Sequence, residues 1–467
     1  MRKSLLPAGV TILLAVLMTG AAAQSQFNAS RLESSNPPTL TCSSPPCILP
    51  NVQVSEGGMP VNTAVIAANP ANSSDVLVSS DDINCTSTQG VFASSDGGST
   101  WTRTCLLPGL GGAGSPILGY DLNGNAYAGG LETDYLEPSP SAAQVVLSRS
   151  TDNGMTWGAP VMVINGVLGY GLGMPWLTVD ANPASPRKNS LYVSSVPFDG
   201  SFNSQIWVSH STDSGATWTS VPVDTEQRYF VRDAFNSMIA GADGTVYLSW
   251  LRCNSQSFNC GGTTARFMFS KSTDAGSTWS APTVLATATL TPGFCYAGYG
   301  CLPNVASENI SNTPSLAVFG SGANARVYAA FYNWTGSQMQ VNVATSIDGG
   351  SSWGTPVRVS NSNHGDEFFP WITAGSSGKL VVTWLDRRND PSNVKYQPFV
   401  ATSNNGGTTF SAAHALSNTL SDPNMDGYHG QYIGDYRTHV MADKTLYTVW
   451  MDTRSGSCQS EVGGVEF

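Results

Sequence analysis

The sequence predicts an all-β fold, a single β-propeller of seven four-stranded blades, with six blades as the alternative. One octapeptide that ends in an aromatic residue returns six times along the 467 residues. Segments with the composition of β-strands surround each copy. The chain is rich in glycine (48) and tryptophan (12), and only 11% of its residues are charged. This composition excludes an intrinsically disordered chain and a coiled coil.

The octapeptide reads Ser-Ser-Asp-Gly-Gly-Ser-Thr-Trp in its first copy, and its spacing is typical of propeller blades. The copies begin 56 to 74 residues apart, at Ser94, Ser150, Ser211, Ser272, Ser346 and Ser403. The third residue can accept hydrogen bonds from backbone N–H groups, a glycine can take a positive φ, and the final aromatic residue opens a new strand. We therefore expect structural turns around Asp96, Asp152, Asp213, Asp274, Asp348 and Asn405.

Each copy is expected to join the third and fourth strands of a blade, as the sixth unit illustrates. Phe369–Ala374 and Lys379–Leu385 have the pattern of the first two strands, and Gln397–Thr402 that of the third. The octapeptide and a last edge strand follow. The turn therefore lies opposite to the loop that leads into the first strand.

The two ends of the chain are expected to share the closing blade. After the sixth copy the chain still holds Tyr436–Met441, Thr445–Met451 and Val462–Phe467, which are three strands of a seventh unit. Asn51–Ser55 then supplies the missing outer strand. The propeller is therefore expected to span residues 51–467.

The first 23 residues are predicted to be a signal peptide. Arg2 and Lys3 precede an apolar run from Leu5 to Met18, and three alanines before Gln24 fit a small-residue cleavage site. We expect secretion to the extracellular or periplasmic space, with residues 24–50 as an N-terminal extension. After cleavage, no stretch is long and apolar enough to span a membrane.

The nine cysteines are expected to form disulfides rather than a metal cluster, because no C-x-x-C spacing occurs and the compartment is oxidising. Local spacing favours three pairs: Cys85 with Cys105, Cys253 with Cys260, and Cys295 with Cys301. Cys458 is expected to bridge to Cys42 or Cys47 across the closing blade, which leaves one free thiol. Spacing alone leaves the connectivity open.

The charge balance excludes one class of partner. The net charge is −11, whereas a nucleic-acid-binding protein needs a basic face to neutralise phosphates. No cofactor motif and no metal-ligand spacing occurs, so we expect neither a cofactor nor a metal. The sequence does not set the oligomeric state.

The octapeptide is the Asp-box, or BNR repeat, and the chain resembles the sialidase-like β-propeller superfamily over nearly its whole mature length. The resemblance implies a protein directed at a glycan or glycoconjugate, with an extracellular protein as the other candidate partner. In that family three arginines hold the carboxylate of the substrate. A tyrosine activated by a glutamate is the nucleophile, and an aspartate is the general acid.

The resemblance places the site on the face opposite to the octapeptide turns. Charged groups gather there, among them Asp81 and Asp435. Tyr436 precedes a first strand late in the chain, as the nucleophilic tyrosine of the family does, and Glu367 is its expected activating carboxylate. The expected substrate-binding residues are Arg232, Arg387 and Arg437.

A second set of charged residues has a structural interpretation. Asp386 with Arg388, and Asp452 with Arg454, occupy matching places after second strands. The repetition favours a structural ion pair over two separate pieces of a site.

The activity remains open at this point. The first arginine of the family stands before Ile-Pro, whereas Asn312 and Gly173 stand at the nearest matching positions here. Two functions are therefore expected as alternatives. One is a secreted sialidase-like glycoside hydrolase, of the exo-α-sialidase type or acting on another acidic sugar. The other is a non-catalytic extracellular propeller that binds a glycan or a protein.

Overall fold

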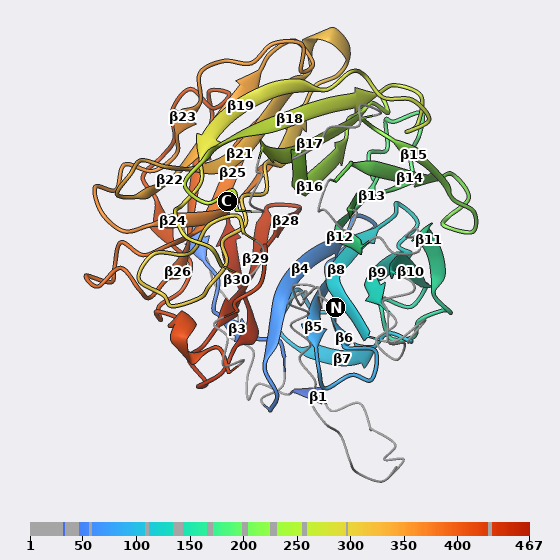
Figure 1. The fold of residues 1–467 in the computed structure, drawn as a ribbon. Coiled ribbons are helices and arrows are strands. Elements are labelled where there is room, and N and C mark those ends of the chain that lie inside the picture. Colours follow the sequence, from blue (N-terminus) through green and yellow to red (C-terminus); the bar gives the residue numbers. More distant parts are fainter. Residues whose placement is uncertain are drawn as a thin grey trace, which may run out of the picture.

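The computed structural model describes residues 31–32, 46–55, 58–107, 112–133, 143–165, 171–198, 204–224, 231–254, 259–295, 298–427 and 432–467. The predicted signal peptide and most of the N-terminal extension lie outside the described residues. The described part forms seven antiparallel sheets arranged radially, as Figure 1 shows. The protein is therefore a seven-bladed β-propeller, as predicted, and the six-bladed alternative is excluded.

The first strand of each blade lies innermost and contacts the first strand of the next blade around the ring. These strands are β4 (Val61–Asn69), β8 (Gly112–Tyr120), β12 (Gly171–Val179), β16 (Val231–Ala240), β20 (Ser315–Phe319), β24 (Glu367–Ala374) and β28 (His439–Ala442). β28 contacts β4, so the last blade packs against the first and the ring is closed (Figure 1).

The other strands follow outward in chain order within each sheet. The second strands are β5 (Asn72–Asp82), β9 (Ala126–Thr133), β13 (Leu191–Phe198), β17 (Val246–Asn254), β21 (Arg326–Trp334), β25 (Leu380–Asp386) and β29 (Thr445–Asp452). The third strands are β6 (Gln89–Ser94), β10 (Ala143–Ser150), β14 (Trp207–Ser211), β18 (Thr264–Ser272), β22 (Met339–Ser346), β26 (Gln397–Ser403) and β30 (Gln459–Glu466). The fourth strands of six blades are β7 (Trp101–Cys105), β11 (Val161–Asn165), β15 (Thr219–Pro222), β19 (Thr283–Thr289), β23 (Val357–Arg358) and β27 (His414–Ala415).

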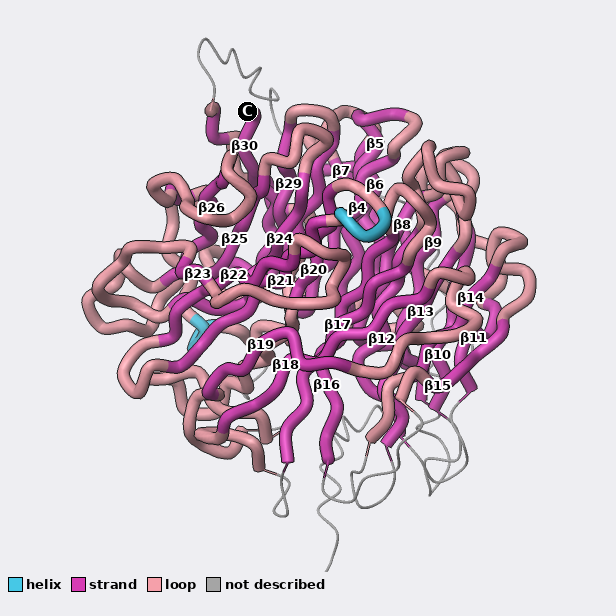
Figure 2. The backbone as a smooth tube through the Cα atoms, turned by 90° about the horizontal axis from the view of Figure 1, so that it is seen from above, coloured by secondary structure: helices cyan, strands magenta, loops and turns pink. Residues whose placement is uncertain are grey.

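The N-terminal segment completes the seventh blade, as predicted. Both β2 (Cys47–Ile48) and β3 (Val52–Gln53) pair with β30, on the side away from β29. A further short strand, β1 (Arg31–Leu32), pairs with β7 of the first blade. The two helical elements in the described residues are single 3₁₀ turns, η1 (Gly322–Asn324) and η2 (Pro423–Met425), drawn in cyan in Figure 2.

All six octapeptides form the predicted turns between third and fourth strands. In the first copy, Oδ1 of Asp96 accepts hydrogen bonds from the backbone N–H groups of Ser99 and Thr100 at 3.0 and 2.9 Å. The indole of Trp101 donates to the carbonyl of Gly98 at 3.0 Å. Hydrogen bonds from the threonine or serine directly before the tryptophan lower the pKa of Asp213 and Asp348 to about 2. These carboxylates are therefore ionised at neutral pH and stabilise the turn by accepting its hydrogen bonds.

Five of the seven first strands carry a bulge at the same place, which the sequence analysis did not predict. The strand register shifts there, and one non-glycine residue takes a positive φ. These residues are Thr63, Ser115, Met174, Phe235 and Phe369, with φ between 44° and 54°. Such bulges bend a strand and redirect its side chains.

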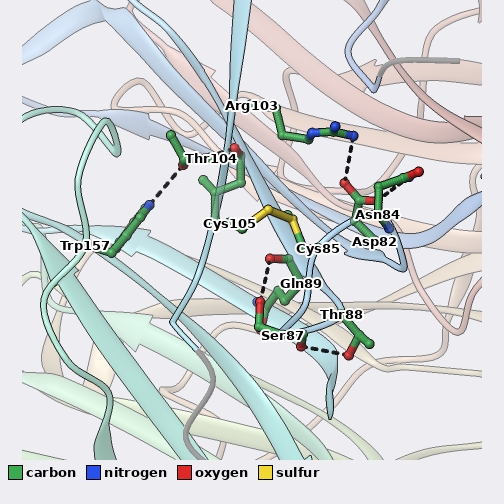
Figure 3. The surroundings of a disulfide bond; sticks show 12 residues. Asp82, Asn84, Cys85, Ser87, Thr88, Gln89, Arg103, Thr104, Cys105 and Trp157 are labelled. Atoms are coloured by element: carbon green, nitrogen blue, oxygen red, sulfur yellow. Dashed lines mark hydrogen bonds and ion pairs between the residues drawn. A yellow bond between two sulfur atoms is a disulfide. The ribbon is translucent and has the colours of Figure 1, made fainter. Parts of the chain in front are cut away.

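The disulfides confirm the three predicted local pairs, Cys85–Cys105, Cys253–Cys260 and Cys295–Cys301. Figure 3 shows the first, beside the hydrogen bond from the Trp157 indole to the Thr104 hydroxyl, which joins the second blade to the first. The prediction for Cys458 is wrong, since its thiol is free and buried. β-pairing rather than a bridge from Cys458 joins the chain ends.

Candidate functional site

The propeller has two faces with different contents. The octapeptide turns lie on one face. On the opposite face, here called the upper face, the first strands begin and the second strands end, because successive strands of a blade are antiparallel. Side chains from several blades meet on the upper face, as the sequence analysis expected.

A phenol and a carboxylate are hydrogen-bonded in the loop that leads into β28. The Tyr432 hydroxyl donates to Oδ2 of Asp435 at 2.7 Å. The Asn309 side chain, from the loop before β20, donates to the other oxygen of Asp435 at 3.4 Å. Tyr432 and Asp435 are both half-buried.

A second carboxylate faces this pair from the first blade. Asp81 lies at the end of β5 and is half-buried, and its Oδ1 has no hydrogen-bond partner among the described residues. Burial, and next the charge of Asp435, raise the pKa of Asp81 well above its usual range. Burial also raises the pKa of Asp435. We call Asp81, Tyr432 and Asp435 the phenol–carboxylate site.

The bulge in β4 positions this site. Gly434 has a φ of +93°, and a Cβ added to it would lie 2.7 Å from the backbone nitrogen of Thr63. Only glycine therefore lets the turn between Tyr432 and Asp435 rest against the bulge. The hydroxyl of Thr63 also lies 3.4 Å from that of Tyr432.

A long loop from the fifth blade supports the site from the other side. It joins β19 to β20, accounts for the largest spacing between octapeptides, and contains the Cys295–Cys301 disulfide. Glu308 in this loop accepts hydrogen bonds from the N–H of Ile433 at 3.2 and 3.3 Å, and burial raises its pKa well above the usual range. The fifth and seventh blades thus meet beneath Tyr432.

Tyr436, the predicted nucleophile, lies in the packed centre of the ring. Its hydroxyl donates to the carbonyl of Pro116 in β8 at 3.0 Å, and only 6% of the residue is exposed. Its ring meets Trp176 edge-on at 5.9 Å, and Trp176 contacts Trp371 at 4.7 Å. Side chains from blades three, six and seven thus fill the axis at this level.

Glu367, the predicted activating carboxylate, has other partners. It accepts a hydrogen bond from the N–H of Val341 at 2.9 Å and lies 3.6–3.7 Å from the guanidinium groups of Arg388 and Arg358. Burial raises the pKa of Glu367 to about 7. The described contacts of Glu367 and Tyr436 have no residue in common, so the structure does not bring the predicted pair together.

The three predicted substrate-binding arginines also contact different groups. The guanidinium of Arg232 lies 4.6 Å above the Tyr299 ring, and that of Arg387 lies 3.6 Å from Asp366. Arg437 donates to the Thr448 hydroxyl at 2.7 Å. No arginine is among the described partners of Asp81, Tyr432 or Asp435.

The repeated structural ion pair is confirmed. Arg388 contacts Asp386 at 2.5 Å, and Arg454 contacts Asp452 at 2.8 Å. In each blade a tryptophan two residues before the aspartate donates its indole N–H to the same carboxylate, from Trp384 at 2.6 Å and from Trp450 at 3.0 Å. Both arginines thus form ion pairs within their own blades.

The sequence analysis placed Asp81 and Asp435 on the upper face, where the structure has them, and did not single out Tyr432, Glu308 or Asn309. Two features of the sequence point to these residues: the long spacing before the fifth octapeptide, which contains Glu308 and Asn309, and the glycine between Ile433 and Asp435, which marks a turn next to Tyr432. Among the described residues, no group of three or more histidine, cysteine or acidic side chains is arranged to hold a metal ion. The same residues include no helix long and apolar enough to cross a membrane.

Comparison with known proteins identifies the family. The model of the BNR repeat-like domain matches residues 135–382, so the chain belongs to this family, which confirms the resemblance drawn from the octapeptide. No curated protein matches the sequence.

Several solved structures have a similar fold at low identity. A Hadza microbial sialidase is 15% identical, with 85% of this chain and 74% of that chain covered and a TM-score of 0.47. An α-L-arabinanase from Penicillium chrysogenum, solved with arabinobiose, is 14% identical, with 75% and 92% covered and a TM-score of 0.44. An intramolecular trans-sialidase from Ruminococcus gnavus, solved with oseltamivir carboxylate, is 13% identical, with 70% and 91% covered and a TM-score of 0.44.

Proposed function

We propose that the protein is a glycoside hydrolase that binds a glycan on the upper face and cleaves it at the phenol–carboxylate site. The observation that carries the proposal is the 2.7 Å hydrogen bond from Tyr432 to Asp435 beside the second carboxylate, Asp81. A nucleophile hydrogen-bonded to a base, with a separate acid nearby, is the arrangement that covalent catalysis needs.

Each group has a role in a retaining mechanism. The Tyr432 oxygen attacks the anomeric carbon while its proton passes to Asp435, and protonated Asp81 gives its proton to the leaving oxygen. Water then attacks the anomeric carbon and gives its proton to Asp81, while the bond between that carbon and the Tyr432 oxygen breaks. Asp435 returns its proton to the departing Tyr432 oxygen. The raised pKa of Asp81 supports its role as acid, because the carboxyl group stays protonated to a higher pH.

The charges around the site favour a neutral sugar over an acidic one. Recognition of a carboxylate such as that of a sialoside would require cationic partners, and the described partners of the site include no arginine. An exo-α-sialidase activity is therefore the less supported version of this proposal.

The second candidate function is non-catalytic binding of a glycan or protein at the same face. It is favoured by the phenol of Tyr432, because burial raises its pKa well above 10 and so disfavours the phenolate. In this case Tyr432 acts as a hydrogen-bonding and stacking group for the ligand.

The proposed place of action is outside the cell or in the periplasm. The disulfides of the described residues indicate folding in an oxidising compartment. We propose that residues 1–23 direct export and are removed, since Arg2, Lys3 and the apolar run that follows have the composition of a signal peptide.

The test is a panel of chromogenic neutral glycosides and a fluorogenic sialoside, assayed with the mature protein and with Tyr432→Phe. We expect hydrolysis of a neutral glycoside, and a loss of at least about 10²-fold in kcat in the variant. Tyr127→Phe is the matched control, because it removes a phenol–carboxylate hydrogen bond, 3.1 Å long to Asp121, on the octapeptide face.

Two results would decide against the proposal. Equal rates for wild type and Tyr432→Phe would remove Tyr432 from the chemistry. No turnover of any glycoside, together with Tyr432-dependent binding on a glycan array, would establish the non-catalytic alternative.

A further inference from the structure

Three arginines are buried in the described part of the chain, and one of them has no carboxylate partner. Arg252 contacts Asp224 and Asp233 at 2.7 and 2.6 Å. Arg387 lies 3.6 Å from Asp366. Arg437 is only 2% exposed and forms no described ion pair.

The guanidinium of Arg437 is also short of hydrogen-bond acceptors. One nitrogen, Nη1, donates to the hydroxyl of Thr448 at 2.7 Å. The other two nitrogens, Nε and Nη2, are buried and have no partner among the described residues. A buried cation in this state destabilises the folded protein, because it has lost its hydrogen bonds to water and only one protein acceptor replaces them.

The titratable neighbours of Arg437 provide no negative charge. Tyr396 donates its phenol to the carbonyl of Met451 at 2.7 Å, and burial raises the pKa of Tyr396 well above 10. Burial and the charge of Arg437 lower the pKa of His439 well below 6.5, so this imidazole is neutral. Burial lowers the pKa of Arg437 to about 9, which still leaves it charged at neutral pH.

A small cavity adjoins this arginine near the axis. It lies between the beginnings of the first strands of blades five, six and seven, and its volume is about 10 Å³, roughly the room of one water molecule or one small ion. Its lining includes Ser311, Thr313, Phe369, Trp371, Tyr436 and Arg437.

We propose that Arg437 and this cavity form a site for one monatomic anion of the halide class, buried at the axis of the propeller. The anion would accept hydrogen bonds from Nε and Nη2 and balance the charge of the guanidinium. None of the three residues of the phenol–carboxylate site lines this cavity, so the two sites are distinct. Its predicted role is to stabilise the junction of blades five to seven.

The first test locates the ion in the wild-type protein. Crystals of the mature protein grown in sodium bromide should show an anomalous bromide peak within hydrogen-bonding distance of Nε or Nη2 of Arg437. An ordered water molecule without anomalous signal at this position, or an empty cavity, would overturn the proposal. This test needs no variant and is independent of any hydrolytic activity.

The second test measures the linkage between halide and stability. A ligand that binds the folded state raises the unfolding midpoint as its concentration rises. Replacing sodium gluconate by sodium bromide at constant ionic strength should raise the thermal midpoint of the wild type and of Arg326→Met, an exposed control. Arg437→Met should show no halide-dependent shift. An equal shift in both variants would contradict the assignment.

Discussion

The close approach of Gly434 to the β4 bulge gives the sharpest prediction about the candidate site. Gly434 has a φ of +93°, and a Cβ there would meet the backbone of Thr63 at 2.7 and 2.8 Å. Gly456, in the turn between β29 and β30, has nearly the same φ, +92°, but a Cβ would meet nothing within 4 Å. The two glycines therefore differ in packing and not in backbone conformation.

The expected costs of alanine follow from this difference. At Gly456 alanine lowers the free energy of unfolding by about 1–2 kcal/mol, because it must take a left-handed backbone conformation there. At Gly434 the overlap with the Thr63 backbone adds about 1–3 kcal/mol, because neither backbone is free to move without disturbing its neighbours. Gly434→Ala should therefore destabilise the protein by ~2–5 kcal/mol in total.

The assay compares urea unfolding of the two variants, followed by tryptophan fluorescence. Gly434→Ala should have the lower midpoint. It should also weaken the hydrolysis or glycan binding that depends on Tyr432, because it displaces the turn that holds Tyr432 and Asp435. Gly456→Ala should keep that activity. If the two variants unfold at the same urea concentration, the close approach contributes nothing and the reasoning is refuted.

Three further predictions concern packing, burial and cross-linking. Tyr436→Phe removes a buried hydrogen bond to Pro116 and should cost about 1–2 kcal/mol in urea unfolding while hydrolysis per folded molecule persists; loss of turnover at unchanged stability would contradict this. Burial raises the pKa of Glu367 to about 7, so the folded state keeps a proton that the unfolded state releases. Stability should therefore fall by up to about 3 kcal/mol as the pH rises from 4.5 to 7, and Glu367→Gln should flatten that part of the pH profile; an unchanged profile would argue against the shift. Replacing Cys85 and Cys105 by alanine should lower the free energy of unfolding by about 3 kcal/mol. A reductant should lower the stability of the wild type more than that of this variant; an equal loss in both would show that the bridge does not stabilise the fold.

The repeat made the architecture predictable from local chemistry. The Asp-box turn is held by hydrogen bonds within eight residues, so six copies fixed six places where a third strand meets a fourth. Alternating apolar segments fixed the other strands. The Cys253–Cys260 disulfide was predictable for the same reason, because its two cysteines are only seven residues apart in the chain and lie close together in any compact loop.

The site depended on contacts that no local pattern encodes. Tyr432 meets Asp435 within one loop, but Asp81 reaches them only because the ring closes, and Glu308 only because a long loop of the fifth blade extends to the seventh. The sequence analysis chose Tyr436 from its place before a strand. The orientation of that side chain is set by the packing of three blades around the axis.

The amino-acid sequence therefore determined the blade and its turn, because both are stabilised by residues close together in the chain. The six repeats and the strands left over at the two chain ends predicted seven blades, and the long-range pairing of those ends decided it. The tertiary structure alone decided which polar groups meet. Arg387 fits a ligand-binding role as well as a structural one until its carboxylate partner, Asp366, is known. Asp366 lies in the loop before β24 and Arg387 follows β25, so their pairing is decided by how the chain folds back, whereas Asp386 is only two residues from Arg388 and that pair could be predicted from the sequence.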